Sequence, residues 1–205
     1  FGLHYIFGVV YFSLRLFRHM LWQHGNAVGG GSVVYANTLL VPPEKVWRSG
    51  TWALLRDWAA EMPGHYRTAE KMLGVTTNPL LADADHMLKK LADEAGVGGS
   101  FYRTRVAVYF GADDEHAQPQ QQGDPYFAGQ GPARAPCVGC GGCMVGCRHR
   151  AKNSLDYNYL YLAEKLGAKV LAESRVSRIE PLGEDKGRTG WRVTVQPFKQ
   201  PEQHF

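Results

Sequence analysis

All four cysteines of this 205-residue chain lie within one short segment. Their spacing, Cys-x2-Cys-x2-Cys-x3-Cys, is that of the bacterial ferredoxin run, which holds iron–sulfur clusters through thiolates. Glycines between the cysteines give the backbone enough freedom for successive sulfurs to point at one centre. The pattern predicts one cluster held by three or four of these thiols: Cys137, Cys140, Cys143 and Cys147.

Three other states of the cysteines compete with a cluster. Zinc also takes four thiolates, but its structural sites pair two knuckles across an intervening segment, and these cysteines are too close together for that. Disulfides need an oxidising compartment, and residues so close rarely form two unstrained bridges. Four reduced thiols in a loop are the third alternative. The ferredoxin run also normally carries proline after its last cysteine, where this chain has Arg148.

Basic residues follow the cysteines and are expected to offset part of the thiolates' negative charge. Among the eight histidines, only His149 is a candidate neighbour of a cluster. No pair of carboxylates is placed for general acid–base work. The basic residues in question are Arg148, His149, Arg150 and Lys152.

A second segment, "GNAVGGGSVVYAN", contains three consecutive glycines and a serine. It differs from the dinucleotide fingerprint G-x-G-x-x-G, yet such a turn lets a phosphate or a ring approach the backbone closely and offers N–H donors. A flexible linker is the alternative. The apolar, β-rich flanks favour a buried turn.

Helices are expected mainly before the cysteines, and most of the strands are expected near the end of the chain. Amphipathic spacing predicts three helices before the cysteines and one after them, and alternation predicts strands. The region before the cysteines is polar and rich in Gln, Gly and Pro, which predicts a long loop. The expected helices are two between 47 and 74, one at 83–95 and one at 153–166; the strands are 104–110, 168–173, 175–182 and 190–195; the loop is 111–136.

Composition excludes some classes of function. A net charge of +4 with scattered basic residues gives no case for nucleic-acid binding. The opening run "FGLHYIFGVVYFSL" is too short to span a bilayer and lacks the features of a signal peptide, so a cytoplasmic location is expected. That run is expected to be a buried segment, with contact to a membrane surface as the alternative. Because the chain begins with Phe1, we expect a fragment of a longer protein.

Three ordered blocks of the sequence resemble the glucose-methanol-choline (GMC) family of flavin oxidoreductases, in its cholesterol oxidase-like branch. They are "HGNAVGGGSVVYANTLLVPP", "DPYFAGQGPARAPCVGCGGCMVGCRHRAKNSLDYNYLYLAEKLGAKV" and "RVSRIEPL". The resemblance covers nearly the whole chain. It implies an α/β fold, here an α+β fragment, with part of a Rossmann-type FAD-binding domain and the helical part of a substrate domain.

The resemblance also implies domain segments and contacts with FAD. Residues 1–46 and 151–205 are expected in the FAD-binding domain, 47–110 in the substrate domain and 111–150 in a loop with the cysteines. Val176 is expected beside the adenine end of FAD through its backbone. The residues expected to bind FAD are Gly29, Gly30, Gly31, Ser32, Tyr35, Asn37 and Val176.

The implied activity is oxidation of the CH–OH group of a hydrophobic alcohol, sterol-like or long-chain, by hydride transfer to FAD. The implied electron acceptor is oxygen or a redox protein. No residue here matches the His/Asn pair of the family's active site, so no catalytic residue is assigned and this chain alone is expected to be inactive. The alternative from another class is a ferredoxin-like iron–sulfur electron carrier with no substrate chemistry of its own.

Overall fold

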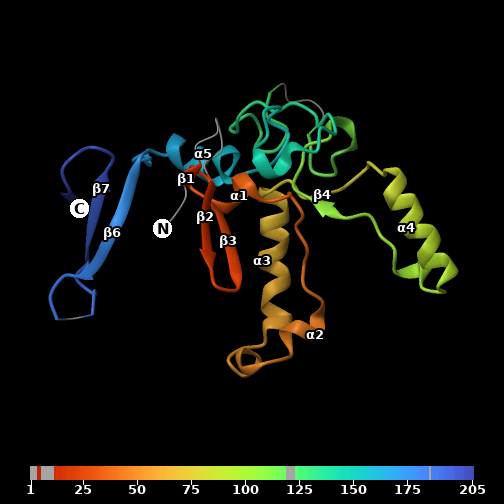
Figure 1. Ribbon diagram of the computed structural model, residues 1–205, viewed down its shortest axis with the longest axis horizontal. Helices are drawn as coiled ribbons and strands as arrows, with labels where there is room; N and C mark the ends of the chain where they lie inside the picture. The colour runs from red at the N-terminus through yellow and green to blue at the C-terminus, as the bar shows by residue number, and fades with distance from the viewer. Residues whose placement is uncertain (1–3, 6–11, 119–122, 185) are drawn as a thin grey trace. The chain divides into compact units, whose positions relative to one another are not determined.

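The computed structural model describes residues 4–5, 12–118, 123–184 and 186–205, and the chain divides into two compact units. The first unit spans Phe1–Leu166 and the second spans Gly167–Phe205. Figure 1 shows a mixture of helices and strands, as expected for an α+β fragment. Every pair of named strands is antiparallel in the described part of the chain, so the structure does not display the parallel sheet of a Rossmann-type domain.

The first unit opens with a small antiparallel sheet, β1 (His4–Tyr5), β2 (Phe12–Phe17) and β3 (Met20–Gly25). Most of the apolar run that we expected to be buried lies outside the described residues. The described part of the β2–β3 hairpin is exposed: Leu16 is 82% exposed. After the hairpin, the glycine run forms one helical turn, α1 (Gly31–Val34), before an extended segment follows.

The core of the first unit is built around the segment 105–109, which the alternation at 104–110 predicts as a strand. One end of it forms β5 (Arg105–Val106), which pairs with β4 (Thr76–Thr77). Isolated bridges join it to two other segments, Thr38 to Val106 and Val108 to Lys152. The apolar side chains buried here are Val75, Val106, Ala107, Val108 and Ala151.

The region 47–74 contains one long helix rather than the two that we expected. α2 (Glu44–Trp47) and the 3-10 turn η1 (Thr51–Leu54) precede α3 (Trp58–Met72). The start of α3 is fixed by Asp57, whose side chain accepts a hydrogen bond from the Ala60 amide at 3.3 Å. Trp52 therefore lies outside the helix, where its ring contacts the Trp47 ring at 5.7 Å.

α4 (Asp83–Glu94) forms where the amphipathic spacing predicts it, and the 3-10 turn η2 (Gly98–Ser100) follows. The predicted loop 111–136 contains the short turn η3 (Gly111–Asp113) and no longer element among its described residues. No helix in the described ranges is long and apolar enough to cross a membrane.

The helix expected at 153–166 is shorter than predicted. The 3-10 turn η5 (Leu155–Tyr157) comes first, and α5 is Tyr159–Lys165. The start of the expected helix pairs with a distant segment instead: the Asn153 amide donates to Ala107 O at 2.9 Å and so continues the strand-like pairing of this segment. The Asn158 side chain then accepts from the Tyr159 amide at 2.5 Å and caps the helix.

The second unit is an antiparallel sheet of β6 (Ser174–Pro181), β7 (Trp191–Pro197) and β8 (Gln203–His204). β6 and β7 confirm the predicted hairpin, with a register shift between Val176 and Arg178. The strand expected at 168–173 is wrong. Those residues form no strand and are exposed, because no other described strand pairs with them.

Candidate functional site

The four cysteines lie in a loop, residues 137–147, that is attached to the core at both ends. We call it the cysteine loop. At its start the Cys137 amide donates to Tyr109 O at 2.9 Å, and just after its end the Tyr109 amide donates to Ala151 O at 2.8 Å. Within the loop, η4 (Gly142–Val145) forms one 3-10 turn. The loop therefore leaves and rejoins the core beside one residue, Tyr109.

All four cysteines line one cavity of about 30 Å³, which we call the thiol cavity. Its inner wall includes Val108, Ala151 and Lys152, and His149 also lines it. Three glycines of the loop have positive φ angles, 67° at Gly139, 69° at Gly141 and 92° at Gly146. Only glycine adopts such angles readily, which explains why they alternate with the cysteines.

Two of the sulfurs already accept hydrogen bonds from backbone amides. The Gly139 amide donates to Cys137 Sγ at 3.4 Å, and the Ala151 amide donates to Cys147 Sγ at 3.3 Å. Cys140 is exposed, whereas Cys137, Cys143 and Cys147 are half-buried. The cavity is thus closed by the core on one side and by an exposed part of the loop on the other.

Lys152 is the charged group that closes the base of the thiol cavity. Its side chain is 1% exposed, and its ammonium donates to Val33 O at 2.7 Å, Tyr35 O at 3.1 Å and Cys143 O at 2.7 Å. The ammonium also lies 5.0 Å from the centre of the Tyr35 ring. A single side chain therefore ties the cysteine loop to the segment that follows the glycine turn.

The pKa values around this cation follow from burial and from charge. Burial lowers the pKa of Lys152, and the charges of Cys143 and Cys147 act in the opposite direction. Burial raises the pKa of the Cys143 thiol, while its hydrogen bond with Asn37 and the charge of Lys152 lower it. Burial, with a smaller contribution from Cys143, raises the pKa of Tyr35 to about 12. Tyr35 is therefore neutral at physiological pH.

The glycine turn, residues 29–32, is held against the segment that follows the cysteine loop. The Ser32 hydroxyl donates to Gly29 O at 2.6 Å and accepts from the Leu155 amide at 2.9 Å. A Cβ on Gly29 would lie 2.8 Å from Val33 and 3.3 Å from Asp156 Oδ1, so that position has no room for a side chain. By contrast, a Cβ on Gly30 or Gly31 would meet no heavy atom within 4 Å. The turn is half-buried at Gly29 and Gly30 and exposed at Gly31, so it is less buried than we expected.

The structure joins two sites that the sequence presents separately. Tyr35 and Asn37, which we expected along FAD, both interact with Cys143 of the thiol cavity. Val176 lies apart from them in the chain, on β6 of the second unit, and is 52% exposed. The contacts of all seven residues with FAD stay predictions.

The basic residues that we expected near the thiols behave differently from one another. His149 lines the thiol cavity and Lys152 is buried at it, whereas Arg148 and Arg150 are exposed. Within the described residues, no group of three or more His, Cys, Asp or Glu side chains is placed so that it could hold a metal ion. Metal binding by the four cysteines therefore stays a prediction.

Arg134 holds the segment that follows the cysteine loop, a contact that sequence reasoning did not identify. Its guanidinium donates to the carbonyls of Ala151 and Lys152 and to the side chain of Asn153, and it lies 4.8 Å from the centre of the Tyr157 ring. Burial lowers its pKa. Its place in a Gly- and Pro-rich loop gave no signal of this contact, because the partner segment is 17 residues away in sequence.

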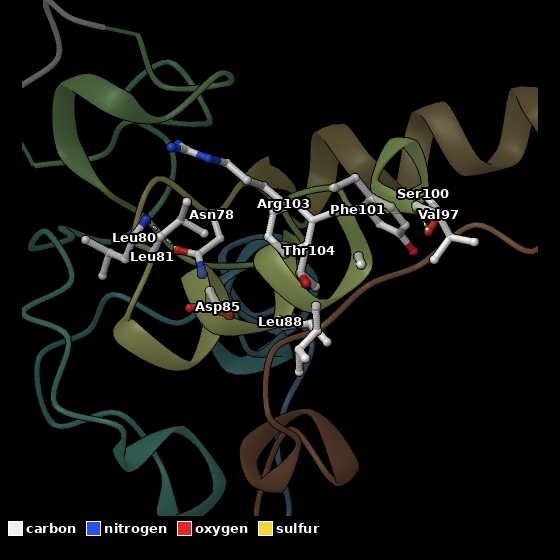
Figure 2. Close-up of a pocket in the computed structure, with 13 residues that line it drawn as sticks. Asn78, Leu80, Leu81, Asp85, Leu88, Val97, Ser100, Phe101, Arg103 and Thr104 are labelled. Atoms are coloured by element: carbon white, nitrogen blue, oxygen red, sulfur yellow. Dashed lines mark hydrogen bonds between the residues drawn. The ribbon is translucent and has the colours of Figure 1, made fainter. Parts of the chain in front are cut away.

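A groove of about 510 Å³ lies between α4 and the residues on either side of it in the chain (Figure 2), and we call it the α4 groove. Its lining is mostly apolar, with Leu88, Leu91 and Phe101 among the side chains. Two of its polar residues already have local partners: Asn78 accepts from the Leu80 amide at 3.0 Å and Asp85 accepts from the Ala82 amide at 2.8 Å. The groove offers apolar surface but no group of reactive side chains.

Comparisons with known proteins identify close relatives. A protein of Acinetobacter baumannii named cholesterol oxidase is 55% identical over 186 residues, which cover 90% of this chain and 33% of the relative. Proteins with the same name from two strains of Mycobacterium tuberculosis are 47% identical over 163 residues, which cover 80% of this chain and 28% of each relative. No protein-family model matches the chain. The chain therefore spans about a third of the length of the curated relatives that it matches.

Proposed function

Because the chain belongs to the cholesterol oxidase-like branch of the GMC family of flavin oxidoreductases, we propose that it forms part of an FAD-dependent alcohol oxidoreductase. The similarity to proteins named cholesterol oxidase, along most of this chain, is the observation that carries the proposal. The proposed substrate is a hydrophobic, sterol-like alcohol whose CH–OH group becomes a carbonyl. Bound FAD would supply the hydride acceptor.

The glycine turn has the features needed to lie against FAD. Gly30 and Gly31 have open space where a side chain would otherwise stand, so a cofactor can approach the backbone there. The Ser32 hydroxyl holds the turn in place, because it donates to Gly29 O and accepts from the Leu155 amide, and it keeps one lone pair for a ligand. Its proposed role is therefore to fix the turn against which FAD would lie.

The acceptor that reoxidises the flavin in the proposed enzyme is oxygen or a redox protein. The name of the relatives, cholesterol oxidase, favours oxygen. The thiol cavity lies beside the proposed flavin turn, since Lys152 bonds to Val33 O, Tyr35 O and Cys143 O.

The test is a substitution that fills the open space beside the turn. Gly31 has open space and no positive φ, so Gly31→Val adds bulk without strain within the chain. The matched control is Gly99→Val, at a glycine in η2 that also has open space and no positive φ. We expect full-length protein to be purified with FAD and to oxidise cholesterol, and Gly31→Val to lose both.

The control decides what a loss means. Gly99→Val should keep the FAD content, the activity and the thermal stability of the wild type. Gly31→Val should have the same thermal stability as Gly99→Val but a lower FAD content. FAD content is measured by flavin absorbance and by fluorescence of the released cofactor. Wild-type protein that never binds FAD, or Gly31→Val that binds it with unchanged affinity, would contradict the proposal.

A further inference from the structure

We propose that Cys140 and Cys143 form a reversible disulfide that weakens the hold of the cysteine loop on the glycine turn. The spacing, exposure and contacts of the thiols support the bond itself. Only the source of the oxidant and the effect on FAD rest on the proposed function. The pair is a modification site within the thiol cavity and takes no part in the oxidation of the alcohol.

The two residues form a Cys-x-x-Cys motif with two glycines between the thiols. Cys140 is exposed and Cys143 is half-buried. Redox-sensing pairs have this arrangement, an accessible thiol that meets the oxidant and a resolving thiol beside it. The chain turns between the two thiols, since Gly141 has a φ of 69° and a Cβ on Gly142 would lie 3.6 Å from Cys140 Sγ. The Cys140 sulfur therefore lies beside the residue that precedes Cys143.

The other two cysteines are held in different contacts. The Gly139 amide donates to Cys137 Sγ at 3.4 Å, and the Ala151 amide donates to Cys147 Sγ at 3.3 Å. Both cysteines also pack against the buried apolar cluster that includes Val108. A disulfide from either would disturb an amide contact and a packed side chain. Cys140 and Cys143 are therefore the pair that joins at the lowest cost to the core.

The size of the thiol cavity suits a bond between two thiols. In the part of the chain that the structure describes, no three His, Cys, Asp or Glu side chains are placed to hold a metal ion. A volume of about 30 Å³ holds little more than one water molecule. A disulfide adds no atom to the cavity, because two hydrogens leave and the sulfurs approach to about 2.05 Å. The lining therefore has room for this product without an outward movement of its walls.

Hydrogen peroxide is the oxidant that we assign to the pair. The Cys140 thiolate attacks one peroxide oxygen, and the O–O bond breaks to give a sulfenic acid and hydroxide, which takes up a proton to become water. The Cys143 thiolate then attacks the Cys140 sulfur, the S–O bond breaks, and the leaving hydroxide becomes a second water. With oxygen as the proposed acceptor of the flavin's two electrons, O₂ also gains two protons and becomes hydrogen peroxide. The oxidant would then be a product of the proposed enzyme.

Cys143 is the residue through which the pair acts on the glycine turn. The Lys152 ammonium donates to Cys143 O at 2.7 Å and to Tyr35 O at 3.1 Å, and the Cys143 thiol has a hydrogen bond with Asn37. A disulfide removes the thiol hydrogen and draws Cys143 toward Cys140. Both contacts should weaken, so the oxidised protein should bind FAD about tenfold less tightly, the effect of losing one hydrogen bond to a charged group.

The experiment locates the disulfide in full-length protein that is reduced, freed of reductant without oxygen and treated with hydrogen peroxide. Trypsin leaves all four cysteines on one peptide, residues 135–148. Free thiols are therefore alkylated with one reagent, the disulfide is reduced and alkylated with a second, and fragment ions show which label each cysteine carries. We expect the second label on Cys140 and Cys143 only, and on neither when dithiothreitol follows the peroxide.

FAD affinity is measured on the same samples by titrating the apoprotein with FAD and following flavin fluorescence. Peroxide should raise the dissociation constant of the wild type by about tenfold and leave that of Cys140→Ser and Cys143→Ser unchanged. Exposed Cys140 keeps the test valid if Cys143→Ser fails to fold. The matched control is Met144→Ser, because Met144 is 54% exposed and peroxide also oxidises methionine. This control should respond to peroxide as the wild type does.

Four results would overturn the switch. These are a second label on a different pair, sulfinic acid without a disulfide, a metal ion that blocks alkylation of the purified protein, and an FAD affinity that the disulfide leaves unchanged. An effect of peroxide that is absent from Met144→Ser would assign it to methionine oxidation and would also refute the switch. A disulfide in protein that binds no FAD would refute the proposed function and leave the pair standing, whereas FAD binding without a disulfide would do the reverse.

Discussion

The thiol cavity and the α4 groove are built in opposite ways. The groove is formed by one continuous stretch of chain, from Asn78 to Thr104, and has a volume of about 510 Å³. The thiol cavity has about 30 Å³, yet it joins the cysteine loop, the core segment at Val108 and, through Lys152, the segment after the glycine turn. Size alone would select the groove as the site, following the usual expectation for ligand pockets.

The chemistry of the two regions points the other way. Four thiols and a buried cation meet at the cavity, whereas Asn78 and Asp85 of the groove are occupied by local hydrogen bonds. Burying the Lys152 ammonium lowers the stability of the fold unless its hydrogen bonds and nearby charges compensate it. In this chain, reactive side chains that come together from distant segments therefore indicate the functional site better than the volume of a pocket does.

The largest effect is expected at Lys152. Lys152→Met removes the ammonium from three carbonyl oxygens and should lower the free energy of unfolding by about 4 kcal/mol, because three acceptors on half-buried residues lose this donor. The control is Lys90→Met on α4, whose side chain is 78% exposed and which should change stability by less than about 0.5 kcal/mol. Denaturant unfolding of both variants gives the two values. Equal effects would abolish the contrast between the regions.

A pair of glycines gives the next largest difference. Gly74 and Gly96 follow α3 and α4, and both have positive φ, 53° and 73°. A Cβ on Gly74 would lie 2.6 Å from Asn153 Nδ2 and 2.7 Å from the Tyr126 ring, while a Cβ on Gly96 would meet nothing within 4 Å. Gly74→Ala should therefore cost about 3 kcal/mol and Gly96→Ala about 1 kcal/mol.

The common backbone angle makes Gly96→Ala an internal control. Gly96→Ala adds only the strain of the left-handed backbone conformation. The difference in stability between the two variants therefore measures the packing around Gly74, where Asn153 lies. The thermal unfolding midpoints of the two variants provide the measurement. If Gly96→Ala proved as costly as Gly74→Ala, the end of α4 would be as closely packed as the core.

These contrasts also separate what the sequence could predict from what it could not. α4 and the β6–β7 hairpin were predicted correctly because their signals, amphipathic spacing and alternation around a turn, lie within a few residues. The cysteine loop was predicted for the same reason. The helical turn at Gly31–Val34 was not, since its flanks favour strands and its backbone angles depend on glycine.

The joining of the two predicted sites depends on contacts between distant residues. Lys152 bonds Val33 O across 119 positions, and Leu155 bonds Ser32 Oγ across 123 positions. No periodicity or spacing carries such information. The wrong strand at 168–173 has a related cause: its alternation is local, but a strand also needs a partner, and the described residues provide none.

A smaller effect is expected at the paired strands β4 and β5, which flank the stretch of chain that forms the α4 groove. There Glu115 accepts from the Thr77 amide at 2.9 Å and forms an ion pair with Arg105. Hydrogen bonding with Thr77, followed by the interaction with Arg105, lowers the pKa of Glu115 to about 2 from an ordinary value of 4.5. A lowered pKa adds stability that is fully present above pH 4.5 and is lost as the pH falls toward 2.

Glu115→Gln should therefore remove part of the acid-induced loss of stability in that pH range. The expected size is about 1 kcal/mol or less, because the Glu115 side chain is 42% exposed and solvent screens the pair. Thr77→Val keeps the backbone N–H that donates to Glu115, so it should reduce the loss of stability at low pH less than Glu115→Gln does. The check is the free energy of unfolding measured from pH 6 to pH 2 at low and high salt. An unchanged acid limb in Glu115→Gln would show that this junction does not depend on Glu115.

The smallest effect is expected on the apolar face of α4. Leu88 lines the groove and is 59% exposed, so Leu88→Gln in this 205-residue chain removes little buried area and should change the free energy of unfolding by less than about 0.5 kcal/mol. Leu166→Gln is the matched control, at a leucine outside the groove that is 89% exposed. Denaturant unfolding should give the same midpoint for both variants. A clear loss for Leu88→Gln alone would mean that the groove is covered in solution, and the contrast between an open groove and a closed thiol cavity would then fail.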